Sequence, residues 1–116
     1  MVETNGRNFD LLTLGQVLLR LSPPDNERLS RGDTFVKQVG GAELNVAVGA
    51  ALLGLHTGVI SKLPAHDIGS FMKGKIRSFG VSDDFFMYDQ SPAARVGIYY
   101  YENGAYPRKP KVIYDR

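Results

Sequence analysis

Residues 40–63 read GGAELNVAVGAALLGLHTGVISKL, and this stretch decides the fold. After two glycines, every side chain from Glu43 to Leu55 is apolar or small except Glu43 and Asn45, which predicts a helix buried on all sides. Residues 57–63 (TGVISKL) then predict a strand. A helix, a tight turn and a strand are typical of a strand–helix–strand unit. We therefore expect an α/β fold whose parallel sheet has right-handed crossovers.

The flanking segments extend this unit on both sides. Residues 9–21 (FDLLTLGQVLLRL) predict a buried strand, a bend at Gly15 and a second short strand, and residues 34–39 predict a strand at a sheet edge. After residue 63 a second helix is predicted, with Asp67 as its N-cap and Gly80 just past its end. Its apolar stripe would comprise Ile68, Phe71, Met72, Ile76 and Phe79.

The pattern changes after Gly80 to short aromatic strands. Residues 85–88, 95–101 and 111–114 are rich in Phe, Tyr, Val and Ile, and loops with Asn103-Gly104 and prolines separate the last two. Two helices and a few core strands cannot close a doubly wound core. We therefore expect this chain to be part of a larger fold, or to be completed by another chain.

Composition excludes several classes of site. The 116 residues include no cysteine and only two histidines, which excludes disulfides, thiolate metal sites and a cysteine nucleophile. Fourteen basic and 12 acidic residues leave a net charge of +2, too small to argue for a nucleic-acid partner. The polar start is not a signal peptide, and the ten-residue apolar run at 46–55 is shorter than a membrane span of about 20 residues. We expect a soluble, cytoplasmic protein with no membrane partner.

Two segments are candidate binding sites on chemical grounds. Gly40 and Gly41 would let a ligand approach the backbone at a helix N-terminus, where Asn45 offers a donor and an acceptor; a plain glycine turn with a satisfied helix end is the alternative. Alternation would place Tyr99 and Tyr101 on one face of their strand. Tyr99 could stack there on a sugar ring, or it could be a half-buried aromatic residue that only packs against its neighbours. Arg116 could bind a carboxylate or be a surface arginine.

These segments resemble the ribokinase-like (PfkB) sugar kinases. The resemblance rests on GGAELNVA at 40–47, Gly54-Leu55, ISKLP at 60–64 and Ile68-Gly69, and it covers residues 9–116. Within that family the chain looks most like 2-keto-3-deoxygluconate kinases, through LGQVLLRLSP at 14–23, RVGIY at 95–99 and VIYDR at 112–116.

The resemblance implies a ribokinase-like α/β fold with a small β-sheet lid over the sugar. Residues 1–116 would be the N-terminal portion of the kinase domain, with lid strands at roughly 17–39 and 85–116, and the ATP-binding and catalytic portion absent. The intact enzyme would use ATP and Mg²⁺ to phosphorylate the 6-hydroxyl of 2-keto-3-deoxygluconate or a related sugar acid. The substrate-binding residues would be Gly40, Gly41, Asn45, Tyr99, Tyr114 and Arg116, the last meeting the carboxylate.

No catalytic, cofactor-binding or metal-binding residue is expected in this chain, because the family's later signature, with its catalytic aspartate and anion hole, does not occur in it. We expect the chain alone to lack kinase activity and to bind neither ATP nor Mg²⁺. A homodimer formed through the lid would be consistent with the family. The alternative function is a non-catalytic carbohydrate-binding or dimerisation module built on the same half-fold.

Overall fold

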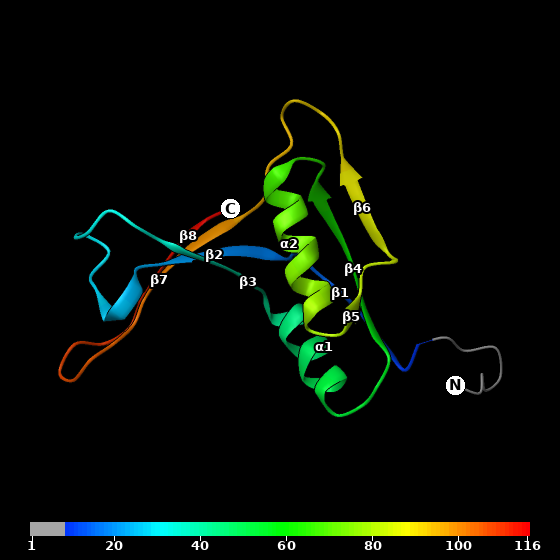
Figure 1. Ribbon diagram of the computed structural model, residues 1–116, viewed down its shortest axis with the longest axis horizontal. Helices are drawn as coiled ribbons and strands as arrows, with labels where there is room; N and C mark the ends of the chain where they lie inside the picture. Colours follow the sequence, from blue (N-terminus) through cyan, green and yellow to red (C-terminus); the bar gives the residue numbers. More distant parts are fainter. Residues whose placement is uncertain (1–8) are drawn as a thin grey trace.

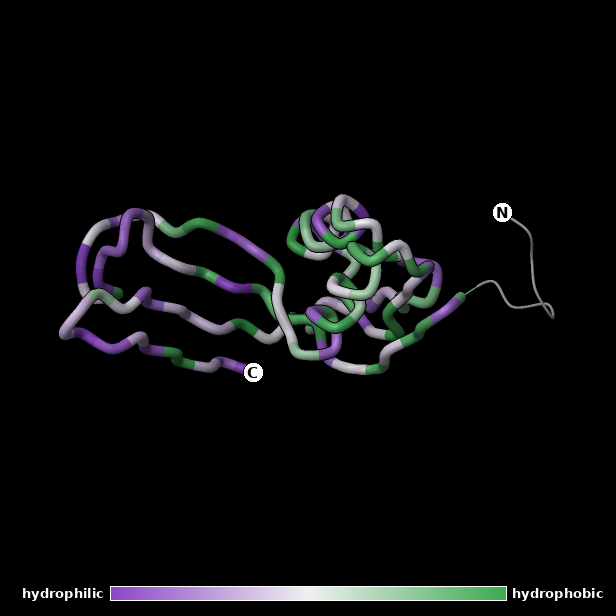
Figure 2. Tube along the Cα trace, turned by 90° about the horizontal axis from the view of Figure 1, so that it is seen from below, coloured by the Kyte–Doolittle hydropathy of each residue, from purple (hydrophilic) through white to green (hydrophobic). Residues whose placement is uncertain are grey.

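The computed structural model describes residues 9–116, which form two sheets and two α-helices (Figure 1). One sheet is parallel and carries the helices. The other is a mixed four-stranded sheet that projects away from it, and we call it the lid sheet (Figure 2). In chain order the elements are β1 (Leu11–Leu14), β2 (Leu18–Ser22), the 3₁₀ helix η1 (Pro24–Asn26), β3 (Val36–Gly40), α1 (Ala42–Leu52), β4 (Thr57–Pro64), α2 (Asp67–Ser78), β5 (Val81–Ser82), β6 (Phe86–Asp89), β7 (Ile98–Glu102) and β8 (Lys111–Asp115).

β4 is the centre of the parallel sheet. β1 pairs along one of its edges, and β5 and then β6 pair along the other. Both helices lie on one side of this sheet (Figure 2). This arrangement confirms the predicted α/β fold with a parallel sheet and covering helices.

Alternation along β4 turns one face of the sheet toward the helices. Thr57 and Val59 are buried there, and the Thr57 hydroxyl donates a hydrogen bond to the Ala47 carbonyl of α1 at 3.0 Å. Met72 and Ile76 of α2 are fully buried in the same core. The core therefore lies between the helices and one face of the sheet.

The opposite face of the sheet is uncovered within residues 9–116. Leu12 and Leu14 of β1 and Met87 of β6 are exposed on it, Leu14 over 72% of its surface. Apolar side chains in a position typical of a core are thus open to solvent. Neither helix of the described chain is long and apolar enough to cross a membrane.

The prediction that α1 is buried on all sides is wrong for the described residues. Leu44 and Ala47 are buried, whereas Val46 is 57% exposed and Leu53, just past the helix, is 83% exposed. Within the described residues the helix packs chiefly against β1, β4 and β5 of the parallel sheet. Its largely apolar sequence therefore provides more packing surface than residues 9–116 use.

The lid sheet has the strand order β3-β2-β7-β8, with β3 at an edge as predicted. β2 pairs parallel to β7, while the β2–β3 and β7–β8 pairs are antiparallel. Leu19 and its register partners Val39 and Ile98 pack against the core. Arg20 and its partners Gln38 and Tyr99 therefore share the other face, because neighbouring positions alternate.

Residues 86–89 depart from the expectation that the lid resumes near residue 85. They form β6, which pairs with β4 from Ser61 opposite Phe86 to Pro64 opposite Asp89, so the strand belongs to the parallel sheet. Phe86 is 7% exposed and contributes to the core. Burial of this ring against the core, and not its aromatic character, decides which sheet the strand joins.

The start of α2 also differs from expectation by one residue. His66, not Asp67, is the N-cap, and its Nδ1 accepts a hydrogen bond from the Ile68 N–H at 3.2 Å. Asp67 is the first helical residue, where a carboxylate favours the helix dipole. Gly80 follows the helix with φ +83°, as predicted for a left-handed terminating residue.

Candidate functional site

A pocket of about 480 Å³ lies between the start of α1 and one face of the lid sheet, a volume that suits a small molecule. Its lining comprises Leu18, Arg20, Gly41, Ala42, Asn45, Tyr99, Tyr101, Val112, Tyr114 and Arg116. Five of the six predicted substrate-binding residues therefore line one pocket. The sixth, Gly40, directly precedes Gly41, and the binding role of all six stays a prediction.

Gly41 determines how α1 enters the pocket. Its φ of +123° favours glycine, and a Cβ there would lie 2.8 Å from the Gln16 carbonyl oxygen. As the N-cap residue it has no side chain to satisfy the first-turn N–H groups. A ligand oxygen at this end of the pocket could accept from those groups.

The two polar residues in the first turn of α1 point to different places. Asn45 is exposed and lines the pocket, where its amide can donate to and accept from a ligand. Glu43 packs over Gly15, which lacks the Cβ that would overlap the carboxyl group. The side chain that is free to meet a ligand is therefore Asn45.

The tyrosines of β7 and β8 form one wall of the pocket. Tyr99 and Tyr114 are register partners whose ring centroids lie 5.8 Å apart. Tyr101 lines the same pocket, whereas Tyr100 contacts Phe35 with a centroid separation of 5.8 Å. The predicted alternation, with Tyr99 and Tyr101 on one face and Tyr100 on the other, is confirmed.

Gly40 makes room for Tyr99. A Cβ on Gly40 would overlap the Tyr99 hydroxyl and lie 3.1 Å from ring atoms Cε1 and Cζ. Gly40 is buried at the end of β3 and does not itself line the pocket. Its effect on a ligand would therefore act through the position of the Tyr99 ring.

Two guanidinium groups line the pocket, and only one of them is predicted from sequence. Arg116 lies over the Tyr114 ring, with its Cζ 4.6 Å from the centroid. Arg20 of β2 and Tyr101 also line the pocket, and neither is among the six residues predicted from sequence. The alternation of Leu18 and Arg20 is visible in the sequence, but the pairing of β2 with β7 decides which face they share.

The charged residues that line the pocket are all cations. Arg20 and Arg116 are cations, and no aspartate or glutamate lines this pocket. A small molecule with hydroxyl groups and a negative charge fits such a surface, since guanidinium groups bind carboxylates with directed hydrogen bonds.

Most of this chain matches a known protein family in sequence. The sequence pattern of the pfkB family carbohydrate kinases matches residues 8–110. The chain belongs to this family. It is 40% identical over 107 residues to a 2-dehydro-3-deoxygalactonokinase of Haloferax volcanii, which covers 92% of this chain and 33% of the relative. It is 34% identical over 85 residues to a 5-dehydro-2-deoxygluconokinase of Bacillus anthracis, covering 72% of this chain and 26% of that protein.

A solved structure has the same fold as this pfkB-family chain. The crystal structure of 2-dehydro-3-deoxygluconokinase from Thermotoga maritima superposes with a TM-score of 0.85 at 42% identity. That match covers 91% of this chain and 32% of the Thermotoga chain. The sequence therefore spans between about a quarter and a third of the length of these relatives.

A second pocket, of about 500 Å³, lies on the uncovered face at the carboxyl ends of β1, β4 and β6. Lys62 and Asp89 form an ion pair there at 3.8 Å, and the backbone N–H of Ser91 lowers the pKa of the Asp89 carboxyl, against the opposing effect of desolvation. Arg95, also in its lining, pairs with Asp115 at 3.3 Å. The charges of this pocket are thus paired within the chain, unlike those of the first.

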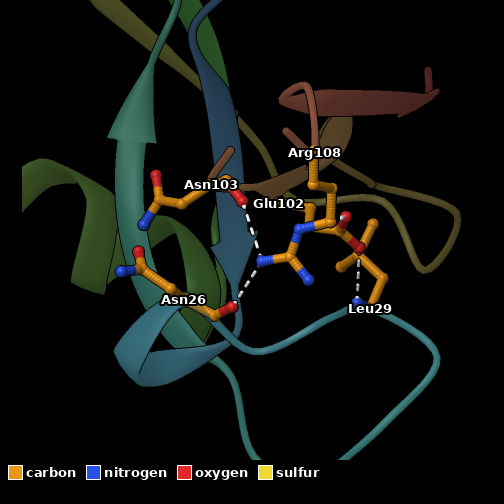
Figure 3. Close-up of polar contacts among 5 residues, drawn as sticks. All are labelled: Asn26, Leu29, Glu102, Asn103 and Arg108. Carbon is orange, nitrogen blue, oxygen red and sulfur yellow. Dashed lines mark hydrogen bonds and ion pairs between the residues drawn. The ribbon is translucent and has the colours of Figure 1, made fainter. Parts of the chain in front are cut away.

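A third pocket, of about 460 Å³, lies at the far end of the lid sheet, beside the cluster in Figure 3. Glu102 is 3% exposed and accepts from the Leu29 N–H at 2.8 Å, while Arg108 Nε lies 3.7 Å from its other oxygen. Arg108 also donates to the carbonyls of Asn26 at 2.7 Å and Asn103 at 3.3 Å. The hydrogen bond from the Leu29 N–H lowers the pKa of Glu102, and nearby cations lower it further, whereas desolvation acts in the opposite direction. This cluster fastens the loop after η1 to the β7–β8 hairpin.

The described residues contain no preformed cluster of metal ligands. Within residues 9–116 no three histidine, aspartate or glutamate side chains come together as metal ligands. Magnesium is held by carboxylates and phosphate oxygens in octahedral geometry. No step involving the metal is therefore assigned to these residues.

Proposed function

We propose that this chain supplies the acceptor-binding pocket and lid of an ATP-dependent kinase that phosphorylates 2-keto-3-deoxygluconate or a closely related keto sugar acid at its 6-hydroxyl. One observation carries the proposal. The start of α1, with Asn45, and the guanidinium of Arg116 face the same pocket, and no acidic side chain lines it.

The two ends of that pocket suit the two ends of a sugar acid. Asn45 and the uncapped first turn of α1 offer amide hydrogen bonds to sugar hydroxyls. Tyr99 and Tyr114 form a wall with rings and hydroxyls suited to the carbon chain. Arg116 offers a bidentate contact to the carboxylate. The Haloferax, Bacillus and Thermotoga relatives are all named as kinases of dehydro-deoxy sugar acids.

Phosphoryl transfer depends chiefly on positioning and charge stabilisation. In this proposal the chain's residues do the positioning of the acceptor: Arg116 holds the carboxylate end, Asn45 holds hydroxyls, and Tyr99 closes over the carbon chain from the lid sheet. Holding the acid end fixes which hydroxyl is presented at the other end of the molecule. ATP supplies the phosphoryl group.

The test uses the full-length product of the gene that encodes this chain. ATP-dependent phosphorylation is measured by a coupled assay for ADP on 2-keto-3-deoxygluconate, 2-keto-3-deoxygalactonate and 5-keto-2-deoxygluconate, with fructose and ribose as neutral sugars. We expect kcat/KM for at least one acid to exceed that for both neutral sugars by a factor of about 100 or more, because only an acid can pair with the Arg116 guanidinium.

Asn45→Ala should raise KM for the preferred acid about tenfold, the equivalent of one or two hydrogen bonds. Asn103→Ala is the matched control, because that side chain is exposed, lies outside this pocket and is not at a positive φ. A preference for a neutral sugar would overturn the proposed substrate. Binding of a sugar acid without phosphorylation would replace the kinase with a carbohydrate-binding module.

A further inference from the structure

Of the charged residues that line the pocket, Arg20 is the one whose charge is least compensated by other groups of the chain. It lies on β2, an interior strand of the lid sheet with β3 on one side and β7 on the other. Its guanidinium carbon lies 5.8 Å from the Tyr101 ring centroid, and its Nε is buried with no hydrogen-bond partner.

No carboxylate of the described chain compensates this cation. The ion pairs found among residues 9–116 do not include Arg20. Its cross-strand neighbour Gln38 has a buried side-chain oxygen that also lacks a partner, but an amide carries no charge to neutralise a guanidinium. A partly buried charge without a counter-charge is unfavourable, so it is best explained by an anion that comes from outside the chain.

Arg20 and Arg116 approach the same pocket from opposite sides of the tyrosine wall. β2 and β8 flank β7, so the two arginines are separated by about two strand spacings across the sheet, roughly 9.6 Å, and by two residues, roughly 7 Å, along it. Arg116 is an exposed residue at the end of an edge strand, whereas Arg20 is half-buried and held between two strands. Solvent screens the charge of Arg20 less than that of Arg116.

We propose that Arg20 is a second contact for the substrate carboxylate and the residue that most determines preference for acids over neutral sugars. This inference rests on the proposed function, because it takes the pocket to bind a sugar acid. The ring of Tyr101 lies beside the guanidinium, 5.8 Å from its central carbon, and helps to hold it in place. Arg116 then completes a clamp on the carboxylate from β8.

The experiment compares Arg20→Met, Arg20→Lys and Arg31→Met in the full-length gene product. Each is assayed on 2-keto-3-deoxygluconate and on 3-deoxyfructose, in which a hydroxymethyl group replaces the carboxylate. Arg31 is an exposed lid-loop residue outside this pocket, so its variant controls for the loss of one surface cation. Calorimetric titration with the sugar acid gives its Kd for each protein, and circular dichroism checks folding.

We expect Arg20→Met to lower kcat/KM for the acid about 10- to 100-fold and to change the value for the neutral analogue less than threefold. Arg20→Lys should restore part of the loss, and Arg31→Met should have no effect. Equal losses on both substrates, or an unchanged Kd for the acid, would overturn the assignment of Arg20.

Failure of the proposed function would look different. An active wild-type kinase whose Arg20→Met variant keeps its preference for acids overturns the role of Arg20 alone. A wild-type protein that neither binds nor phosphorylates a sugar acid overturns both proposals. Binding without phosphorylation overturns the kinase, and the Kd values of the variants still decide on Arg20.

Discussion

Replacing Gly40 by alanine should disturb the pocket from behind its tyrosine wall. The new methyl group would overlap the Tyr99 hydroxyl and press on ring carbons 3.1 Å away. Gly40 is buried and pairs with Leu18, so the backbone of β3 has little freedom to retreat. Inserting a methyl group into such a contact costs about 1–3 kcal/mol. The ring of Tyr99 must then move within the pocket, which should also raise KM for the proposed substrate.

Removing the hydroxyl with Tyr99→Phe should relieve most of this cost, because only the contact with the ring carbons remains. We expect a coupling of about 1–2 kcal/mol in favour of the double variant, from urea unfolding followed by circular dichroism. Gly49→Ala is the matched control, since a Cβ there meets no atom within 4 Å, and it should stabilise α1 by about 0.5–1 kcal/mol. If Gly40→Ala and Tyr99→Phe were additive to within about 0.5 kcal/mol, the contact would not explain the glycine.

Three further predictions concern stability, each followed by urea unfolding. The pKa of Glu102 is lowered below 4.5, chiefly by the Leu29 N–H, so its contribution is present above that pH and is lost as pH falls through the lowered pKa. Glu102→Gln should therefore flatten the acid limb of the stability profile, and an unchanged limb would contradict this. His66→Ala should remove the hydrogen bond to the Ile68 N–H and lower the free energy of unfolding by about 1 kcal/mol. His66→Asn should retain most of this stability, and equal losses in the two variants would argue against capping. Thr57→Val should cost about 1 kcal/mol by leaving an α1 carbonyl without its buried donor, and no loss would show that this bond contributes nothing.

Much of the fold follows from local pattern. The largely apolar run after Gly40-Gly41, the turn and the strand at residues 57–63 are enough to predict the strand–helix–strand unit that the structure contains. Alternation in β7 is equally local, and it correctly separates Tyr99 from Tyr100. Both features depend on periodicities of 3.6 and 2 residues, which the sequence displays directly.

Features that depend on distant partners could not be predicted in the same way. The aromatic strand at residues 86–89 resembles those of the lid sheet, yet Phe86 packs in the core beside β4. The largely apolar sequence of α1 predicts burial, but the exposure of Val46 depends on what else packs there. Local composition describes what a segment can bury, whereas the surrounding chain decides what it does bury.

Arg20 shows how register joins the fold to the pocket. Leu19 and Leu21 flank it and pack toward the core, so a shift of β2 by one residue would turn the guanidinium into the apolar core and a leucine into the pocket. Burying an unpaired cation is strongly unfavourable, which penalises the shifted pairing. The alternation of leucines with Arg20 along β2 therefore favours one register of the lid sheet and places the guanidinium in the pocket. In the proposed function, a substitution that weakened the Leu19 packing would reduce discrimination between acids and neutral sugars without touching the ligand.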